Sequence, residues 1–314
     1  MSLARRILVK ASENHWLREH GPHFRFVRLA ASRFLPGEKV EDALATAESL
    51  AKSNITTLLT ELGENVTERH EAEAVTAHYL DLLGRIREAN LPAEVSVKLT
   101  QLGLDLDREF CFANLVKLIE RSAAVSPSTP KTLWIDMEQS VYVDRTLELY
   151  ALARRSHPNV GVCVQAYLHR TAKDIESLIR MGAAVRLVKG AYSEPPEIAF
   201  ARKQDVDENF FRLAQILLGP EVRRMGVRAV MATHDRALIA RIADWAATQQ
   251  IPKDQLEFAM LFGIQRAEQL RLVRDGYRSD VLISYGSFWF PWFVRRLAER
   301  PANVWFLVRN IFSA

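Results

Sequence analysis

Eight short apolar runs recur along the chain, and segments with helical periodicity separate them. Successive parallel strands need such crossover segments, so the alternation predicts a parallel sheet that helices cover. Because there are eight strand–helix units, a closed (β/α)8 TIM barrel is favoured over an open sheet. The predicted strands are residues 55–59, 94–99, 133–137, 160–164, 185–188, 228–231, 257–262 and 281–285.

The segments between the strands carry helix start and stop signals. The predicted helices cover residues 72–88, 108–121, 144–155, 174–181, 207–218 and 235–247, and a last helix from about 289 to 300 completes the eighth unit. The expected N-caps are Asp107, Asp144, Thr171 and Asp235, and helices should end at Asn90, Gly182, Gly226 and Gly276. Residues 1–52 are predicted to form an N-terminal helical arm, with an amphipathic helix at 40–52, and residues 53–314 to form the catalytic barrel domain.

Composition excludes several classes of protein. The chain has 314 residues, 48% of them apolar, which is enough to bury the core of one large domain. Its net charge of +4 comes from intermixed basic and acidic residues and does not indicate nucleic-acid binding. Only two cysteines occur, Cys111 and Cys163, so a disulfide framework is not expected. No apolar run reaches the roughly 18 residues of a membrane span, and no secretory signal is recognisable, so we expect a cytoplasmic protein.

Polar side chains follow the predicted strands, at the end of such a barrel where active sites lie. They are Gly63 and Glu64 after the first strand, Lys98 on the second, Asp136 and Glu138 on the third, and Gln165 and Tyr167 on the fourth. The later strands lead to Arg186 and Lys189, then Thr233, His234 and Asp235, then Gly263 and Gln265, and last Tyr285 and Gly286. So many polar strand ends indicate a functional site.

Arginines mark two places in this pattern. Arg186 lies inside the apolar run 185–188, where a buried cation must meet an anion or face a polar cavity, although an Arg that reaches solvent remains the alternative. Arg295 and Arg296 are adjacent on the last predicted helix and suit a carboxylate or phosphate clamp. An ordinary surface pair with Glu299 is the other reading of these two residues.

Several other chemistries find little support in the sequence. Neither a GxGxxG nor a GxxxxGK[ST] phosphate-binding loop is present, and no GxSxG nucleophile motif occurs. His70 and Glu71 begin a zinc-binding HExxH pattern, but Ala74 stands where the second His is needed, so no metal is predicted. Asp136 and Glu138 alternate on one strand, which leaves open a carboxylate pair of the glycosidase kind.

Six motifs follow one another along the chain: VSVKLT at 95–100, WIDME at 134–138, QAYLHR at 165–170, VRLVKGAY at 185–192, ATHD at 232–235 and RRLAE at 295–299. Taken in this order, they resemble the proline dehydrogenase family in its short monofunctional bacterial form, within a similarity from about residue 55 to 312. The resemblance implies a distorted (βα)8 barrel that holds FAD. It also implies that a C-terminal helix lies over the active site. It also implies oxidation of L-proline to Δ1-pyrroline-5-carboxylate, with electrons passed to a quinone.

The resemblance further implies roles for individual residues. Hydride transfer to flavin N5 is the cofactor's chemistry, so the protein should bind the substrate carboxylate and supply positive charge. The implied catalytic residues are Lys98, Asp136 and Arg186. The implied substrate-binding residues are Lys98, Leu261, Leu282, Tyr285, Arg295 and Arg296, and Glu64 should pair with Arg295 as a gate. The implied cofactor-binding residues are Asp136, Met137, Val164, Gln165, Arg186, Val188, Lys189, Gly190, Ala191, Tyr192, Thr233 and His234.

Two positions depart from the family pattern. Leu282 stands where many members have a tyrosine that packs on the proline ring, which predicts tolerance of 4-hydroxyproline or another cyclic secondary amino acid. Ala259 replaces a glutamine that meets the flavin, which predicts weaker flavin binding. A catalytically lapsed flavin barrel that acts as a binding protein is the alternative function.

The electron acceptor bears on where the protein works. Use of a quinone implies a transient contact with the inner face of the membrane, to which the apolar segments 289–293 and 304–312 could contribute. A role of these segments in the core is the other reading. The oligomeric state and the purpose of the N-terminal arm are left open by the sequence.

Overall fold

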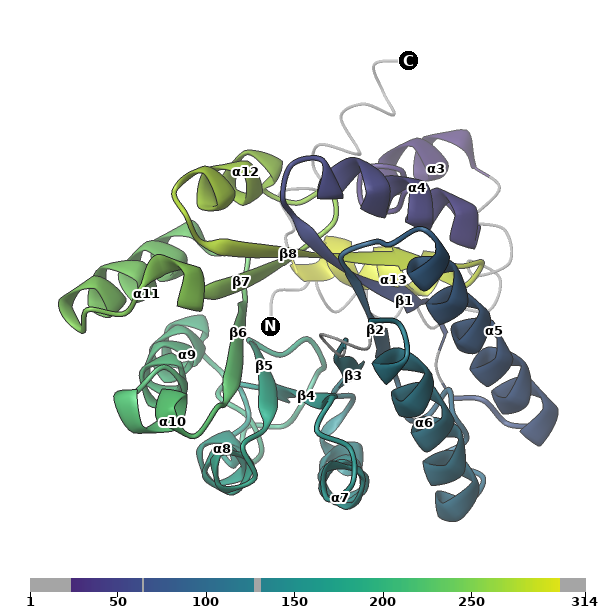
Figure 1. Ribbon diagram of the computed structural model, residues 1–314, viewed down its shortest axis with the longest axis horizontal. Helices are drawn as coiled ribbons and strands as arrows, with labels where there is room; N and C mark the ends of the chain where they lie inside the picture. The colour runs from purple at the N-terminus through teal and green to yellow at the C-terminus, as the bar shows by residue number, and fades with distance from the viewer. Residues whose placement is uncertain (1–23, 64, 127–130, 300–314) are drawn as a thin grey trace.

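The eight predicted strands form a closed parallel barrel, which confirms the fold class (Figure 1). The computed structural model describes residues 24–63, 65–126 and 131–299. Each strand pairs with the next in sequence, and β8 closes the ring on β1. The strands are β1 Thr56–Glu61, β2 Ala93–Val97, β3 Leu133–Ile135, β4 Val160–Gln165, β5 Ala184–Val188, β6 Arg228–Ala232, β7 Glu257–Leu261 and β8 Arg278–Tyr285.

Helices surround the barrel, as Figure 1 shows. They are α3 Arg25–Ala31, α4 Val40–Ala51, α5 Arg69–Glu88, α6 Arg108–Ala123, α7 Val143–Arg154, α8 Thr171–Arg180, α9 Lys203–Leu217, α10 Pro220–Arg224, α11 Arg236–Thr248, α12 Arg266–Arg274 and α13 Trp289–Glu299, with short 3-10 turns η2 Ser140–Tyr142 and η3 Lys253–Gln255. α4 packs on β1 and β8 through the buried Ala43 and Ala47. No helix in the described ranges is both long and apolar enough to cross a membrane.

The N-cap predictions were right at two helices and wrong at two others. Asp107 accepts a hydrogen bond from the Phe110 N–H, and Asp235 caps α11 in the same way. Asp144 instead lies in the first turn of α7, where its carboxylate pairs with Arg170 at 2.7 Å. Thr171 is the first residue of α8, and its hydroxyl donates to the Gln165 carbonyl. In both cases a partner from another element takes the side chain that a cap would use.

The chain before the barrel packs against the helix that follows it. Ala31 and Leu35 join Phe290, Phe293 and Val294 of α13 in a separate apolar cluster. Trp289, at the start of α13, donates to the Glu38 carboxylate at 3.0 Å. Segment 289–293 is therefore largely buried in this cluster, whereas segment 304–312 lies outside the described residues.

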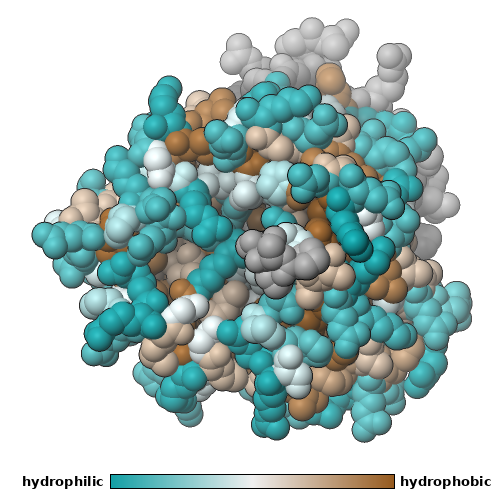
Figure 2. Space-filling model, in the orientation of Figure 1, coloured by the Kyte–Doolittle hydropathy of each residue, from teal (hydrophilic) through white to brown (hydrophobic). Residues whose placement is uncertain are grey.

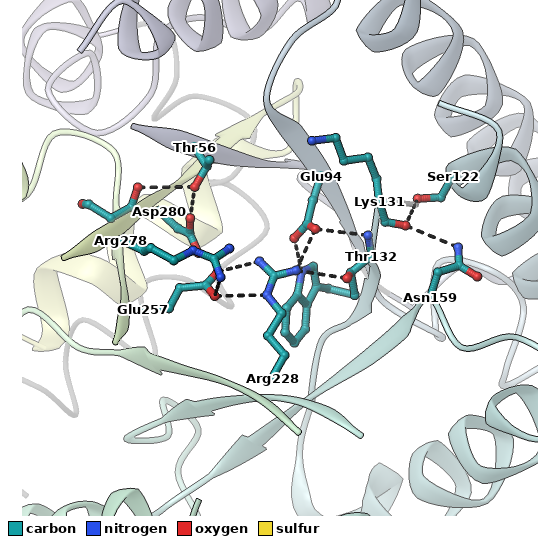
Figure 3. Close-up of polar contacts among 12 residues, drawn as sticks. Thr56, Glu94, Ser122, Lys131, Thr132, Asn159, Arg228, Glu257, Arg278 and Asp280 are labelled. Atoms are coloured by element: carbon teal, nitrogen blue, oxygen red, sulfur yellow. Dashed lines mark hydrogen bonds and ion pairs between the residues drawn. The ribbon is translucent and has the colours of Figure 1, made fainter. Parts of the chain in front are cut away.

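The barrel interior holds an apolar ring above a polar layer. The ring is formed by Leu58, Trp134, Ala184, Val230 and Ala259. The polar layer lies at the amino ends of the strands, where Arg228 points between two carboxylates (Figure 3). The Arg228 guanidinium donates to Glu94 at 2.7 Å and, through two nitrogens, to Glu257 at 2.5 and 3.1 Å. Because these charges are paired inside the fold, the layer closes the barrel without an unpaired ion.

Asp280 completes the polar layer. It is 1% exposed and accepts a hydrogen bond from the Thr56 hydroxyl. Burial, together with the negative charge of Glu257, raises its pKa well above the usual range of a carboxyl group. Although burial acts to raise the pKa of Glu257, a hydrogen bond with Asp280 and the Arg228 guanidinium lower it. The layer thus has two cations, Arg228 and Arg278, facing two carboxylates and one neutral acid.

This protonation predicts the behaviour of Asp280→Asn. Since the folded state keeps a proton that the unfolded chain loses above about pH 4, Asp280 makes stability fall as the pH rises from there. Asn cannot lose that proton and can still donate to Glu257 and accept from Thr56. We expect the variant to be at least as stable at pH 7 and to lose less stability between pH 5 and pH 8, measured by urea unfolding.

Asp275→Asn, at the end of α12, controls for the loss of a carboxylate as such. A loss of about 3 kcal/mol at pH 7 in the Asp280 variant would mean instead that Asp280 is an ionised partner of the arginines.

Candidate active site

The loops at the carboxyl ends of β2, β3 and β4 are tied to one another by side chains. The Thr100 hydroxyl donates to Glu138 at 2.7 Å, and the Gln165 amide donates to the carbonyls of Met137 and Glu138 at 3.0 and 3.1 Å. Glu138 is only 1% exposed. Its carboxylate therefore serves as a link between loops, and the structure does not present it with Asp136 as an open carboxylate pair.

Arg186 lies at the centre of the site, inside the barrel. It is 3% exposed, and its Nη2 atom donates to the Ser96 hydroxyl at 2.9 Å and to Asp136. Ser96 in turn donates to the same Asp136 oxygen at 2.7 Å. Burial alone would lower the pKa of Arg186, but the nearby Asp136, Cys163 and Asp280 together outweigh burial and raise the pKa. The predicted catalytic residues Asp136 and Arg186 thus form one ion pair that holds a cation beneath the mouth of the barrel.

Lys98 places a second cation at the same end of the barrel. It directly follows β2, two positions after Ser96, and is half-buried. Among the described residues no carboxylate forms an ion pair with its ammonium group. The charge of Lys98 acts on Glu61, the last residue of β1. Burial raises the pKa of Glu61, while His78 and Lys98 oppose that rise. Lys98 is therefore available to bind an anion.

Gln165 carries a buried acceptor that the protein does not use. Its side-chain nitrogen is bound to the segment that follows β3, whereas its Oε1 atom is buried and has no hydrogen-bond partner among the described residues. An unsatisfied buried acceptor costs free energy unless a ligand supplies a donor. An imide N–H, as in the isoalloxazine ring of a flavin, is such a donor. The residues of this site therefore fit a flavin.

The β5 to β7 side of the mouth is already rich in internal contacts. Lys189 forms ion pairs with Asp207 and Asp235, the latter at 2.8 Å. Although burial acts to raise it, the pKa of Asp235 is held well below its usual range by Lys189. His234 accepts a hydrogen bond from the Leu261 N–H at 2.9 Å, which fixes its ring against β7. Gly190 follows Lys189 with a φ of +110° and lies against the Tyr167 ring.

Two residues with predicted roles, Tyr285 and Val164, lie on the outer face of the barrel. The Tyr285 hydroxyl forms a 2.8 Å hydrogen bond with His78 of α5, in the helix layer. Leu282 lies three positions earlier, and since side chains alternate along a strand, it faces the interior, where it packs on the apolar ring. Val164 points outward for the same reason, between Cys163 and Gln165. The structure thus brings Leu282 and Leu261 together, in register on β8 and β7, but not Tyr285.

Some predicted residues are only partly described. Glu64 and the side chain of Arg295 lie outside the described residues, so the predicted gate between them stays a prediction. The Arg296 guanidinium carbon lies 5.8 Å from the Trp292 ring on α13. Val188 is the last residue of β5, and Met137, Ala191, Tyr192 and Thr233 lie on the segments that follow β3, β5 and β6.

Sequence reasoning assigned no role to Ser96, although it contacts both members of the central ion pair. The signal was the alternation of β2, which places Ser96 on the same face as Lys98. No group of metal-binding side chains is present in the part of the chain that the structure describes. A parallel barrel whose mouth carries a buried cation, and a second cation and a buried acceptor without partners among the described residues, is the arrangement of a TIM-barrel enzyme.

The comparisons identify the family. The sequence model of the family described as Proline dehydrogenase matches residues 43–309, and the chain belongs to that family, whose members are oxidoreductases. It is 36% identical to proline dehydrogenase 1 of Bacillus subtilis over 286 residues, which cover 91% of this chain and 92% of that protein. It is 32% identical to the proline dehydrogenase of Deinococcus radiodurans, with 90% of each chain covered.

A solved structure supports the fold. The proline utilization A protein of Bdellovibrio bacteriovorus superposes with a TM-score of 0.81 and 24% identity, over 95% of this chain. The chain spans about a third of the length of that larger protein, 36%. The match therefore confirms the barrel.

Removal of the Asp136 carboxylate should reveal how strongly Arg186 depends on it. Asp136→Ala leaves a buried cation without its counter-ion, which costs roughly 3 to 5 kcal/mol. The double variant with Arg186→Met should recover much of that loss, because it removes the unpaired charge. Urea unfolding of the two variants at pH 7 provides the comparison.

Glu208→Ala, which breaks an exposed ion pair with Arg241 on the surface, is the matched control and should cost much less. If Asp136→Ala lowered the free energy of unfolding no more than this control, Arg186 would not need Asp136 as its counter-ion.

Proposed function

We propose that the protein oxidises L-proline to Δ1-pyrroline-5-carboxylate with FAD as the hydride acceptor and passes the electrons to a quinone. Membership of the proline dehydrogenase family supports the substrate. The observation that carries the proposal is the pair of cations at the barrel mouth, Arg186 and Lys98, beside the unused acceptor of Gln165. This combination suits a flavin that becomes negatively charged on reduction and a substrate that carries a carboxylate.

Different residues of the chain would bind the flavin and supply charge to it. Gln165 Oε1 would accept a hydrogen bond from the flavin, and Arg186 would supply positive charge to its ring, with Asp136 and Ser96 holding the guanidinium in place. Bound FAD would take up the hydride from the substrate carbon next to the nitrogen, so no protein nucleophile is required.

The substrate carboxylate would be bound by cations from two elements. Lys98 reaches the mouth from β2, and Arg295 and Arg296 belong to α13, which packs on the N-terminal segment. Three cations around one carboxylate would orient the ring so that its reacting carbon faces the flavin, an effect of positioning. Glu64 would close the site by pairing with Arg295.

A quinone acceptor implies a cytoplasmic enzyme with a peripheral contact on the inner face of the membrane. Figure 2 shows hydrophilic residues over most of the face in view, with apolar residues in scattered patches. Trp289, Phe290 and Phe293 are buried and cannot serve as a membrane anchor without leaving the core. Phe288, just before α13, is 70% exposed and is the residue that we propose to touch the bilayer.

Anaerobic addition of L-proline to the purified protein tests the main proposal. We expect a yellow, FAD-containing protein whose visible absorbance bleaches on addition of proline and returns on addition of a quinone. Arg186→Met should lower the rate of bleaching by roughly a hundredfold or more, since it removes charge from the flavin site. Arg241→Met, on the surface of α11, is the control and should bleach like the natural protein.

Two outcomes would contradict the proposal. Flavin that stays oxidised with proline and with other cyclic amino acids would favour the lapsed, ligand-binding barrel. A protein that takes up no flavin, even when FAD is supplied, would reject the flavin site itself.

A second candidate substrate follows from the interior face of β8. Leu282 and Leu261 lie in register, and Ala259 and Ala232 lie on the neighbouring strands, so small and aliphatic side chains form this wall. None of these four side chains is an aromatic ring that would exclude a bulkier substrate ring. The proposed enzyme would therefore also accept 4-hydroxyproline or a related cyclic secondary amino acid.

Leu282→Tyr should narrow this range. A larger aromatic side chain would fill the space beside the substrate ring, and we expect it to lower kcat/KM for 4-hydroxyproline about tenfold or more relative to L-proline. Ile283→Phe, whose side chain faces the helix layer, controls for added bulk on β8. A natural protein that already prefers proline by several orders of magnitude would reject the tolerant pocket.

A further inference from the structure

Trp134 lies in the barrel interior between the central ion pair and the polar layer. It is completely buried and belongs to the apolar ring of β1, β3, β5, β6 and β7. Two guanidinium groups lie near the indole, one on each side of the apolar ring. The Cζ atom of Arg186 lies 5.3 Å from the centroid of the indole, and the Cζ atom of Arg228 lies 5.2 Å from it. These distances are within the range of cation–π attraction, which is stronger for desolvated cations.

The indole ring is held from below and from the side. Its Nε1–H donates to the Glu94 carboxylate at 2.7 Å, and Glu94 is itself paired with Arg228. On β4, Gly161 leaves room for the ring, because a Cβ atom there would lie 2.7 Å from indole Cε3. The ring therefore cannot turn or slide without breaking a buried hydrogen bond or moving into β4.

The polar layer gives the ring a rigid support. Arg228 is held by Glu94 and by two hydrogen bonds to Glu257, a residue that is 2% exposed. Breaking one of these buried ion pairs leaves an uncompensated charge and is strongly unfavourable. The position of the indole is thus set by contacts that lie outside the candidate active site.

Arg186 needs such a support. Its hydrogen bonds to Ser96 and Asp136 both use Nη2, so among the described residues no oxygen atom binds the other two guanidinium nitrogens, Nε and Nη1. The Cys163 thiol is a further partner, but sulfur forms only weak hydrogen bonds. The face of the indole is a contact that can support the plane away from Nη2.

We propose that Trp134 is a positioning residue: its indole fixes the plane of the Arg186 guanidinium and so the place of the positive charge that faces the flavin. This inference rests on the proposed function for its consequence, but the contact between Trp134 and Arg186 exists with or without a flavin. The support runs from the polar layer through the indole to the cation at the mouth.

The first test measures the midpoint potential of the bound flavin in Trp134→Leu, Trp134→Phe and Gly161→Ala. Leu removes the ring, Phe keeps an aromatic face but loses the hydrogen bond to Glu94, and Ala at 161 displaces the ring. We expect the reduction equilibrium to shift about tenfold toward the oxidised flavin in Trp134→Leu, about 30 mV for a two-electron couple, and less in the other two.

A matched control separates positioning from loss of core volume. Phe258 is fully buried on the outer face of β7, with its ring 5.8 Å from that of Tyr277 and away from Arg186. Phe258→Leu should lower the Tm by a similar amount to Trp134→Leu while leaving the flavin potential unchanged. A role of Trp134 in packing alone would give the same unchanged potential in both variants.

The second test needs no flavin. The Tm losses of Trp134→Leu and Arg186→Met are compared with that of the double variant, in the apoprotein. Because the two side chains are in contact, the double variant should lose less than the sum of the single losses. Additive losses, or a flavin potential in Trp134→Leu equal to that of the natural protein, would each overturn the proposal.

These readouts also distinguish the inference from the proposed function. A natural protein that binds no flavin, or whose flavin proline does not reduce, would reject the proposed function. The Tm comparison would still decide whether Trp134 holds Arg186.

Discussion

Burial of Arg186 in the centre of a barrel strand is the constraint on which the site depends. A guanidinium that is 3% exposed must have a counter-ion, and Asp136 is supplied by β3, two strands away in the ring. Ser96 on β2 completes the group. A shift of one residue in any of these strands would turn its side chain to the helix layer, so the ion pair also specifies strand register.

The interior consists of two charged levels separated by apolar side chains. At the amino ends of the strands, Arg228 and Arg278 face Glu94 and Glu257, while Asp280 stays protonated. At the carboxyl ends, Arg186 is paired but Lys98 is not, among the described residues. The first level is therefore neutral and rigid, and the second has spare positive charge. Only the second can bind an anion without first giving up an internal partner.

Most of the barrel could be predicted from the sequence because its strands are buried on both faces and read as continuous apolar runs. Side-chain contacts between strands could not be predicted in this way. Ser96 and Asp136 are 40 residues apart, and Arg186 is 90 residues from Ser96, so only the closed ring brings them together. The role of Trp134 was hidden for the same reason, since its neighbours Arg186 and Arg228 come from β5 and β6.

The position of Tyr285 shows what a resemblance adds and where strand geometry must correct it. Similarity to a family assigns residues by their place in a motif, and it gave both Leu282 and Tyr285 to the substrate. An odd separation of three positions in a regular strand places two side chains on opposite faces. Leu282 therefore lines the barrel, whereas Tyr285 binds His78 between β8 and α5.

The same separation between paired and unpaired groups indicates where a ligand would find a partner in this protein. Lys189 is neutralised by Asp207 and Asp235, so in the protein alone it shapes the loop after β5. Gln165 is the opposite case: its amide nitrogen is bound to the segment after β3, and its oxygen has no partner among the described residues. A ligand gains most where a buried acceptor or a cation has no partner in the protein. At the carboxyl ends of the strands, such groups are Gln165, the last residue of β4, and Lys98, which follows β2.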